Sequence, residues 1–258
     1  MYKRQGETFG FFAFLLLWRR TSNVLANLRV ILPERPYALL LWEALRVSAN
    51  HARTVVETFL ASNADRIDLV SRIEIAGIDK LNEALRDNKG VILVTAHIGN
   101  WELPGVALAR MGYKITTVAG VQFTRGLTPL LKKMKETVGI KVTNHLESAG
   151  PILRALRKGE IVALHIDGDQ YGERVQVKLF GRETYMPKGP ARLARLTGAH
   201  LIPAIAVRVK RRKIRLEILD EISTKVDETE ITQSIAMILE TYIRTYPNQW
   251  CIFRRIWL

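Results

Sequence analysis

The sequence contains a single cysteine, Cys251, so no intramolecular disulfide can form and nothing indicates an oxidising compartment. We interpret Cys251 as a buried apolar thiol. No serine lies in a Gly-x-Ser-x-Gly elbow, so the sequence shows no site for a hydrolase with a serine nucleophile. Internal repeats, low-complexity tracts and Gly/Ser-rich linkers are also absent. We therefore expect the 258 residues to form one globular unit.

The sequence has no apolar run long enough to cross a bilayer as a helix. The uncharged run Phe9–Trp18 near the start (FGFFAFLLLW) has ten residues, whereas a spanning helix needs about 20. Arg19 and Arg20 follow the run directly, and no Ala-x-Ala cleavage site is present. The run predicts an in-plane or shallowly inserted membrane anchor. A cleaved signal peptide and a buried core helix are the alternatives.

The stretch Tyr37–Leu60 carries apolar residues at three- and four-residue spacing, which predicts an amphipathic helix. Its apolar stripe can face either the core or a membrane. We therefore expect residues 1–62 to form amphipathic, membrane-associating helices and residues 63–258 to form the main domain.

Acidic residues are few relative to basic ones: 25 Asp plus Glu against 39 Lys plus Arg give a net charge of +14. Such an excess favours an anionic partner, which can be nucleic acid, anionic lipid or a phosphorylated substrate. Trp250, Phe253 and Trp257 alternate with Arg254 and Arg255, a mixture typical of a bilayer interface or a nucleic-acid surface. Because zinc-finger spacing, RNP motifs and recognition-helix patterns are absent, we expect no nucleic-acid partner.

From residue 73 onward, short β-branched runs alternate with helical stretches, which predicts an α/β fold with a mixed, partly parallel sheet covered by helices. The run VILVTA is typical of a central strand covered on both faces. The expected strands are Ile73–Ile75, Val91–Ala96, Ile115–Val118, Ile161–Ile166, Val175–Leu179, Leu201–Val207 and Ile214–Ile218. The expected helices are Ile78–Arg86, Trp101–Arg110, Leu127–Val138, Ser148–Arg157, Gly189–Leu196 and Glu228–Thr245.

The segment AHIGNWE places His97 at the tip of the predicted central strand, where ligands usually bind in open α/β sheets. Glu102 falls in the first turn of the following helix, where the helix dipole favours a carboxylate. Gly99 between them allows a sharp turn, so Glu102 can accept a hydrogen bond from one imidazole nitrogen. His97 would then act as a general base oriented by Glu102. The alternative is a histidine hydrogen-bonded within the turn beside a solvated carboxylate.

This segment resembles the His-x4-Asp/Glu motif of the glycerolipid acyltransferase superfamily. Its Gly-Asn-Trp-Glu form is most similar to the late acyltransferases of lipid A biosynthesis, with the phosphatidylinositol-mannoside acyltransferases as close relatives. Three further blocks resemble the family in order: IEIAGIDKLNEALRDNKGVILVT, LRALRKGEIVALHIDGDQYG and VKLFGRETYMPKGPARLARLTGAHLIPAIAVR. The Asp167-Gly168-Asp169 spacing resembles the phosphatidylinositol-mannoside acyltransferases. Glu102, by contrast, resembles the acid found in the lipid A acyltransferases. The resemblance therefore leaves the acceptor open.

The resemblance implies direct transfer of a fatty acyl group from acyl carrier protein or coenzyme A to a lipid hydroxyl, with no further cofactor. His97 would be the base, and Asp167 and Asp169 would lie in an acidic active-site loop. Backbone N–H groups around Gly99 and Asn100, or the side chain of Arg125, are candidates to bind the oxyanion.

Two further groups of residues are candidate ligand sites. Lys188, Gly189 and Arg192 could hold a phosphate, because Gly189 and Pro190 are typical of a helix start. A plain turn with a solvated basic face is the alternative. His165, Asp167 and Asp169 would lie on one side of a strand, but we expect no metal there.

The sequence therefore favours a membrane O-acyltransferase, peripheral or monotopic on the cytoplasmic face of the inner membrane, acting on a lipid A-type glycolipid. A phosphatidylinositol-mannoside or a lysophospholipid acceptor is the first alternative. A catalytically dead lipid-binding relative and a basic nucleic-acid-binding protein are distant ones.

Overall fold

The computed structural model describes residues 17–62, 70–119, 127–144, 149–167, 172–210 and 213–257. The predicted anchor Phe9–Trp18 lies outside these residues, apart from its last two positions. Within the described ranges, no helix combines the length and the apolar character needed to cross a bilayer.

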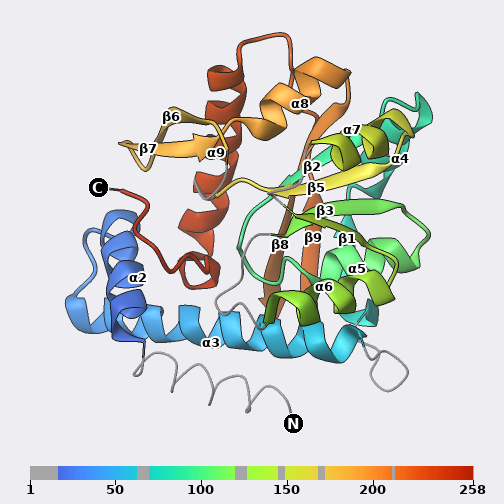
Figure 1. Ribbon diagram of the computed structural model, residues 1–258. Helices are drawn as coiled ribbons and strands as arrows, with labels where there is room; N and C mark the ends of the chain where they lie inside the picture. Colours follow the sequence, from blue (N-terminus) through green and yellow to red (C-terminus); the bar gives the residue numbers. More distant parts are fainter. Residues whose placement is uncertain are drawn as a thin grey trace.

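A seven-stranded sheet forms the centre of the molecule, in the order β1-β9-β8-β2-β5-β3-β4 (Figure 1). Strands β8, β2, β5, β3 and β4 are mutually parallel, whereas β9 runs antiparallel to β8 and pairs in parallel with β1. The strands are β1 (Ile73–Ala76), β2 (Val91–Thr95), β3 (Ile115–Ala119), β4 (Lys141–Asn144), β5 (Ile161–His165), β8 (His200–Lys210) and β9 (Lys213–Ile218). A separate hairpin joins β6 (Arg174–Leu179) to β7 (Arg182–Pro187). The predicted mixed, partly parallel α/β fold is confirmed.

Helices cover both faces of this sheet and build a separate apolar core on each. One core contains residues of α2, α3, α7, α8 and α9, and the other contains residues of α4 and α5. The helices are α2 (Trp18–Ile31), α3 (Tyr37–Ser62), α4 (Ile78–Arg86), α5 (Leu103–Arg110), α6 (Leu127–Thr137), α7 (Gly150–Arg157), α8 (Gly189–Thr197) and α9 (Glu228–Thr245). Short 3-10 turns cover Val70–Arg72 (η1) and Pro247–Gln249 (η2).

Strand β2 is central and buried on both faces, as its uninterrupted apolar run predicts. Ile92 and Val94 belong to one core, while Val91 and Leu93 belong to the other, and none of the four is more than 4% exposed. Successive side chains of a strand point to opposite faces, so both faces need apolar residues. The strand therefore fixes the middle of the sheet and the position of the segment that follows it.

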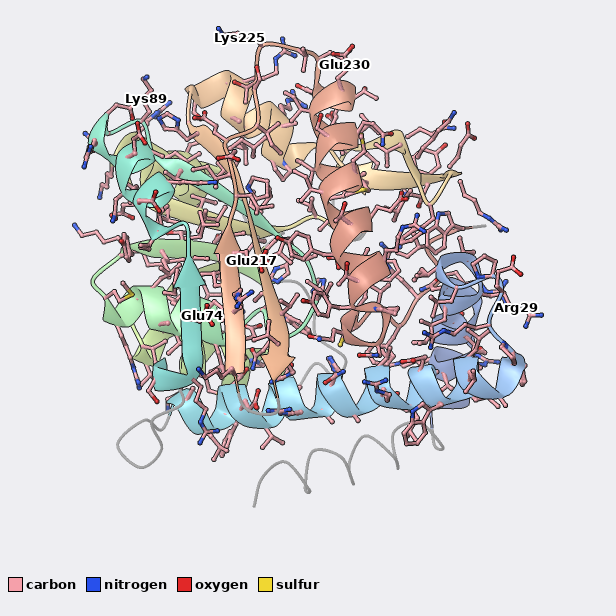
Figure 2. The ribbon with its side chains drawn as sticks, turned by 180° about the vertical axis from the view of Figure 1, so that it is seen from behind. Arg29, Glu74, Lys89, Glu217, Lys225 and Glu230 are labelled. Atoms are coloured by element: carbon pink, nitrogen blue, oxygen red, sulfur yellow. The ribbon has the colours of Figure 1, made fainter. Side chains whose placement is uncertain are left out.

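The long helix α3 lies across the edge of the sheet at which β8 ends, as both views show (Figures 1 and 2). The buried side of α3 includes Leu40, Ala44 and Val47, which share the first core with α2. Several large apolar side chains of α3 remain exposed: Tyr37, Leu39, Trp42, Val55 and Phe59. The predicted amphipathic helix therefore exists, with an apolar buried side and further apolar residues on its surface.

Among the described α-helices and β-strands, three were not predicted from the sequence. Helix α2 lies in the basic segment after the anchor, and β4 is only four residues long. Strand β7 begins with three polar residues, and it reverses from β6 through Phe180 and Gly181, whose φ angles are +54° and +71°. These segments carry weak hydrophobic patterns, and their pairing with neighbouring elements supplies the missing order.

The interpretation of the C-terminal aromatic residues as an interfacial surface is wrong for both tryptophans. Trp250 is 3% exposed and Trp257 is 7% exposed, and both belong to the first core. Cys251 is buried as expected, and burial raises the pKa of its thiol to about 12. The C-terminal segment is therefore a structural part of the domain.

His200, at the start of β8, bridges two carboxylates. Its Nδ1 lies 2.8 Å from Glu221 and its Nε2 lies 3.0 Å from Asp87. Burial lowers the pKa of His200, but the hydrogen bonds and charges of Glu221 and Asp87 outweigh it, so the pKa is raised. A raised folded-state pKa means that this stabilisation is complete below about pH 6.5, the usual pKa of histidine, and is lost at higher pH.

We expect His200→Gln to lower the melting temperature more at pH 6 than at pH 8.5. The measurement is thermal unfolding of both proteins at the two pH values, and the difference between them isolates His200 from other titrating groups. An equal difference at both pH values would contradict this account.

Candidate active site

His97 lies just beyond the C-terminal end of β2, at the edge of the sheet crossed by α3. The neighbouring strand β5 is in register with β2, so that Thr95 pairs with His165. The residues that follow the two strands therefore lie close together. Gly99 then reverses the chain with a φ of +64°, and a Cβ atom there would lie 2.2 Å from the carbonyl oxygen of Ala206. Only glycine fits this turn, as the sequence predicts.

The closest partner of the His97 side chain is Asp167, which follows β5. Nδ1 of His97 lies 2.7 Å from Oδ1 of Asp167, and the backbone N–H of His97 donates to Oδ2 at 2.7 Å. The indole N–H of Trp250 donates to the same Oδ2 at 3.0 Å. The side chain of Asp167 is 1% exposed, whereas that of His97 is 35% exposed. The carboxylate is thus fixed from three directions, while the imidazole stays accessible.

The charges and hydrogen bonds of His97 and Asp167 favour an ion pair between the two side chains. Burial lowers the pKa of His97, but the charge and hydrogen bond of Asp167 outweigh it and raise the pKa above its usual value. Burial likewise raises the pKa of Asp167, and the nearby imidazole together with its hydrogen bonds holds that pKa well below its usual range. Asp167 therefore stays ionised and stabilises a proton on His97.

The structure differs from the sequence-based expectation at Glu102. Its carboxylate pairs with the ammonium group of Lys135 on α6, with Nζ 2.9 Å from Oε2. The hydrogen-bond acceptor at Nδ1 of His97 is Asp167, so the orienting role expected of Glu102 falls to Asp167 in this geometry. Glu102 is still near enough for its charge to raise the pKa of His97. The turn carries Glu102 to the side of the imidazole facing α6.

Asn100, expected to contact substrate, has a structural role instead because it is 0% exposed. Its Oδ1 accepts hydrogen bonds from the backbone N–H groups of Glu102 and Leu103, at 3.2 and 3.1 Å, where α5 begins. Its Nδ2 donates to Oε2 of Glu57 on α3 at 2.7 Å. Asn100 therefore links the turn after His97 to the helix that crosses the sheet edge.

Through Glu57, Asn100 contacts a buried ion pair. Arg208 of β8 lies 2.7 Å from Glu57, and Arg53 pairs with the same carboxylate at 2.8 Å. Arg208 also donates to the hydroxyl of Thr54 at 3.0 Å, and that hydroxyl donates to the carbonyl oxygen of Gly99 at 3.0 Å. Burial raises the pKa of Glu57, but the charges of Arg208 and Arg53 outweigh it and lower the pKa. These contacts attach the turn to α3 and β8.

The C-terminal segment holds the same turn through its backbone. Cys251 donates its N–H to the carbonyl oxygen of His97 at 2.7 Å, and Gly99 donates its N–H to that of Gln249 at 2.9 Å. The Gly99 N–H is therefore occupied by its hydrogen bond to Gln249. It is not available to bind an oxyanion, contrary to the sequence-based expectation. Gln249 also pairs through its side chain with the backbone of Arg208, with bonds of 2.8 and 3.0 Å.

Aromatic rings surround the exposed side of His97. His165 stacks on it with centroids 4.4 Å apart, and Trp101 packs edge-on at 5.1 Å. Nε2 of His165 is buried and has no hydrogen-bond partner among the described residues. Burial, together with the positive charge of His97, lowers the pKa of His165 well below its usual value, so its ring stays neutral. Two uncharged rings therefore form an aromatic wall beside His97.

A cavity of about 50 Å³ lies between α2, α3 and the C-terminal segment. His51 lines this cavity and stacks on Trp101 with centroids 6.0 Å apart. The other lining residues are Leu17, Arg20, Thr21, Ser48, Ala52 and Phe253. The surface that these residues expose to the cavity is formed mainly by carbon atoms, which suits hydrocarbon better than a polar group.

The candidate phosphate-binding residues Lys188, Gly189 and Arg192 make their described contacts elsewhere in the structure. Lys188 and Arg192 both pair with Glu173, at 2.6 and 3.0 Å, and Lys188 also lies 3.6 Å from Glu228. Gly189 begins α8 as expected. No contact between these residues and His97 or Asp167 occurs in the described ranges, so a phosphate site there stays a prediction. Arg125 and Asp169 lie outside the described residues.

Comparison with known proteins identifies the family of this chain. A family described as bacterial lipid A biosynthesis acyltransferase matches residues 1–258. The chain belongs to this family. It is therefore an acyltransferase, and the resemblance inferred from the motifs is confirmed.

Individual relatives come from both branches of the family. A phosphatidylinositol mannoside acyltransferase of Mycolicibacterium smegmatis is 30% identical over 215 residues, which cover 81% of this chain and 70% of the relative. A protein of the same description from Mycobacterium tuberculosis H37Rv is 30% identical over 210 residues, covering 80% of this chain and 64% of the relative. A lipid A biosynthesis acyltransferase of Haemophilus influenzae is 22% identical over 185 residues, covering 70% and 58%. The matched part of the chain thus spans less than two thirds of the length of the Mycobacterium tuberculosis and Haemophilus influenzae relatives.

Proposed function

We propose that this acyltransferase moves a fatty acyl chain from an acyl thioester, on acyl carrier protein or coenzyme A, to a hydroxyl of a membrane glycolipid. The observation that carries the proposal is the His97–Asp167 dyad at the sheet edge, with an accessible imidazole and a buried carboxylate 2.7 Å away. This arrangement suits deprotonation of an alcohol by a base that needs no protein nucleophile.

The dyad supports each proton transfer of such a reaction. Asp167 accepts the N–H of the His97 Nδ1, which leaves the lone pair of Nε2 free for the acceptor hydroxyl. The hydroxyl oxygen then bonds to the thioester carbonyl carbon as its proton passes to Nε2. When the C–S bond breaks, the imidazolium returns that proton to the thiolate. Asp167 stabilises the imidazolium that exists between these steps.

For the acceptor we propose a glycolipid of the lipid A or phosphatidylinositol-mannoside type. The relatives named above act, by their descriptions, in lipid A biosynthesis and on phosphatidylinositol mannosides. A lysophospholipid is the remaining candidate. The apolar cavity lined by His51 and the aromatic wall beside His97 support a substrate that carries hydrocarbon.

We further propose that the protein works at the cytoplasmic face of the inner membrane, as a peripheral or monotopic protein. The N-terminal part of α3 exposes Tyr37, Leu39 and Trp42, which are 53%, 49% and 57% exposed. Arg35 and Arg46 flank them with side chains 45% and 48% exposed. Aromatic and basic side chains together favour the interface of an anionic bilayer. The net charge of +14 acts in the same direction.

A matrix of donors and acceptors tests the proposal. The purified protein is incubated with radiolabelled acyl carrier protein and acyl coenzyme A donors, each over lipid A precursors, phosphatidylinositol mannosides and lysophospholipids. We expect ester formation on one glycolipid class and none with His97→Ala, which should still bind anionic vesicles. Transfer to lysophospholipid alone would reject the glycolipid acceptor, and equal transfer by His97→Ala would reject the mechanism.

A further inference from the structure

Lys135 is the one lysine or arginine of the described residues whose charge is seen to act on the pKa of His97, and no sequence motif marks it. It lies near the C-terminal end of α6, and its Nζ contacts Oε2 of Glu102 at 2.9 Å. The side chains of Lys135 and Glu102 are 12% and 19% exposed. A lysine so far removed from water needs a charged partner, and Glu102 supplies it.

The other lysine ion pair of α6 is different. Lys132 pairs with Glu136 at 3.8 Å, and its side chain is 46% exposed, as expected for a solvated surface pair. Lys135 alone of the two is turned toward the sheet edge and enclosed there. Enclosure has an energetic cost, so a surface role does not account for the position of Lys135.

The charge of Lys135 affects the pKa values of the two stacked histidines, His97 and His165. It opposes Asp167 and Glu102 by lowering the pKa of His97, and it also lowers the pKa of His165. Its ammonium therefore lies within electrostatic range of both stacked imidazoles. In the order Asp167, His97, Glu102 and Lys135, the four groups alternate in sign when His97 is protonated, so each cation has an anion as its neighbour.

We propose that Lys135 is a catalytic residue that donates an N–H to the oxyanion of the acyl-transfer intermediate, and that Glu102 is the positioning residue that holds it. This inference rests on the proposed function. It gives the acid of the His-x4-Glu motif a task other than orienting His97. It also supplies a donor where the Gly99 amide, already bonded to Gln249, cannot.

The chemistry balances without another reactant. Attack by the acceptor oxygen breaks the carbonyl π bond, and its electron pair moves to the carbonyl oxygen. An ammonium N–H of Lys135 stabilises that negative charge by a charge-assisted hydrogen bond and keeps its proton. The electron pair then re-forms the carbonyl as the C–S bond breaks. The thiolate takes its proton from His97.

The test measures kcat and KM for Lys135→Met, with Lys132→Met as the matched control on the same helix. Loss of one oxyanion donor typically lowers kcat about 10²–10³-fold, so we expect a loss of that size with little change in KM. The control should match wild type. Lys135→Arg should recover part of the lost kcat, because it restores a cation of different shape. Melting temperatures show whether each variant is folded.

Glu102→Gln separates this role from direct orientation of His97. We expect a loss in kcat similar to that of Lys135→Met, and no further loss in the double variant, because the two residues act as a unit. The pH profiles should nevertheless shift in opposite directions. Loss of Lys135 raises the pKa of His97 and moves the acidic limb of kcat to higher pH, whereas loss of Glu102 moves it to lower pH.

Three results would overturn the inference. An unchanged kcat in Lys135→Met, with wild-type transfer intact, would remove Lys135 from the reaction while leaving the proposed function in place. A raised KM with unchanged kcat would show that Lys135 binds an anionic group of a substrate instead. Absence of transfer by wild type with every donor and acceptor would remove the proposed function and this role together.

Discussion

Replacing Asp167 with asparagine should lower kcat about 10²–10⁴-fold, the contribution typical of a general base. The side-chain amide introduced by Asp167→Asn can donate to Nδ1 of His97, which would favour the tautomer with its proton on Nε2. That tautomer has no lone pair facing the acceptor hydroxyl. The loss should equal that of His97→Ala, and combining the two changes should add little.

The pH profile of the asparagine variant gives an independent signature. His97 acts as a base only when neutral, so activity rises with pH through its pKa. Asp167 raises that pKa, so its replacement should move the acidic limb of the remaining activity to lower pH. Nitrogen chemical shifts of His97 in labelled protein would report the tautomer directly, even if the variant is less stable.

The control is Asp220→Asn, because the Asp220 side chain is 91% exposed and pairs only with Lys80 among its described contacts, at 2.6 Å. This variant should retain wild-type kcat. Retention of more than about a tenth of the activity in Asp167→Asn, with the tautomer unchanged, would remove Asp167 from the mechanism, since a general base contributes about 10²-fold or more.

Replacing Arg208 with methionine should lower the free energy of unfolding by about 3–5 kcal/mol, the usual cost of leaving one member of a buried ion pair alone. Glu57 is 2% exposed and would keep only Arg53 as a charged partner. For a chain of this size such a loss corresponds to a fall in melting temperature of roughly 10 °C. Thermal and denaturant unfolding measure it.

A double-variant cycle separates the pair from its surroundings. Arg208→Met combined with Glu57→Gln should cost less than the sum of the two changes, because each removes the charge that the other leaves unpaired. Arg46→Met is the surface control on α3, since Arg46 lies 3.5 Å from Glu43 and is 48% exposed. It should cost less than about 1 kcal/mol. Equal losses for Arg208→Met and Arg46→Met would contradict the account.

Local patterns in the sequence predict the parts of the site that depend on local structure. The apolar run of β2 fixes a central strand, and the end of that strand fixes His97 at the sheet edge. Gly99 marks the reversal because only glycine adopts its backbone conformation without strain. These features need only a few neighbouring residues, so a single sequence contains the information.

The partners of His97 depend on strand order, which a local pattern does not contain. Asp167 reaches His97 because β5 lies beside β2 in parallel register. Its position just after a predicted strand was the available signal, since parallel neighbours end at the same edge. Trp250 and Lys135 carried no such signal, because a tryptophan among arginines and a lysine among lysines match surface patterns equally well.

Glu57 and Arg208 show the same difficulty for buried charges. Glu57 falls off the apolar stripe of α3, and a charged residue there is normally solvated. It is buried because α3 crosses the ends of the strands, where Arg208 of β8 meets it (Figure 1). In the sequence Glu57 and Arg208 look like surface charges. Only their contact in three dimensions shows that they form a buried ion pair.

The bonds from residues 249–251 to the turn at His97 also bear on when activity can arise during protein synthesis. Gln249 and Cys251 hold the backbone of this turn, and Trp250 holds Asp167. These residues leave the ribosome long after His97 does. A nascent or prematurely terminated chain that lacks them carries His97 without these supports, so under the proposed function acyl transfer can begin only after residues 249–251 have been translated.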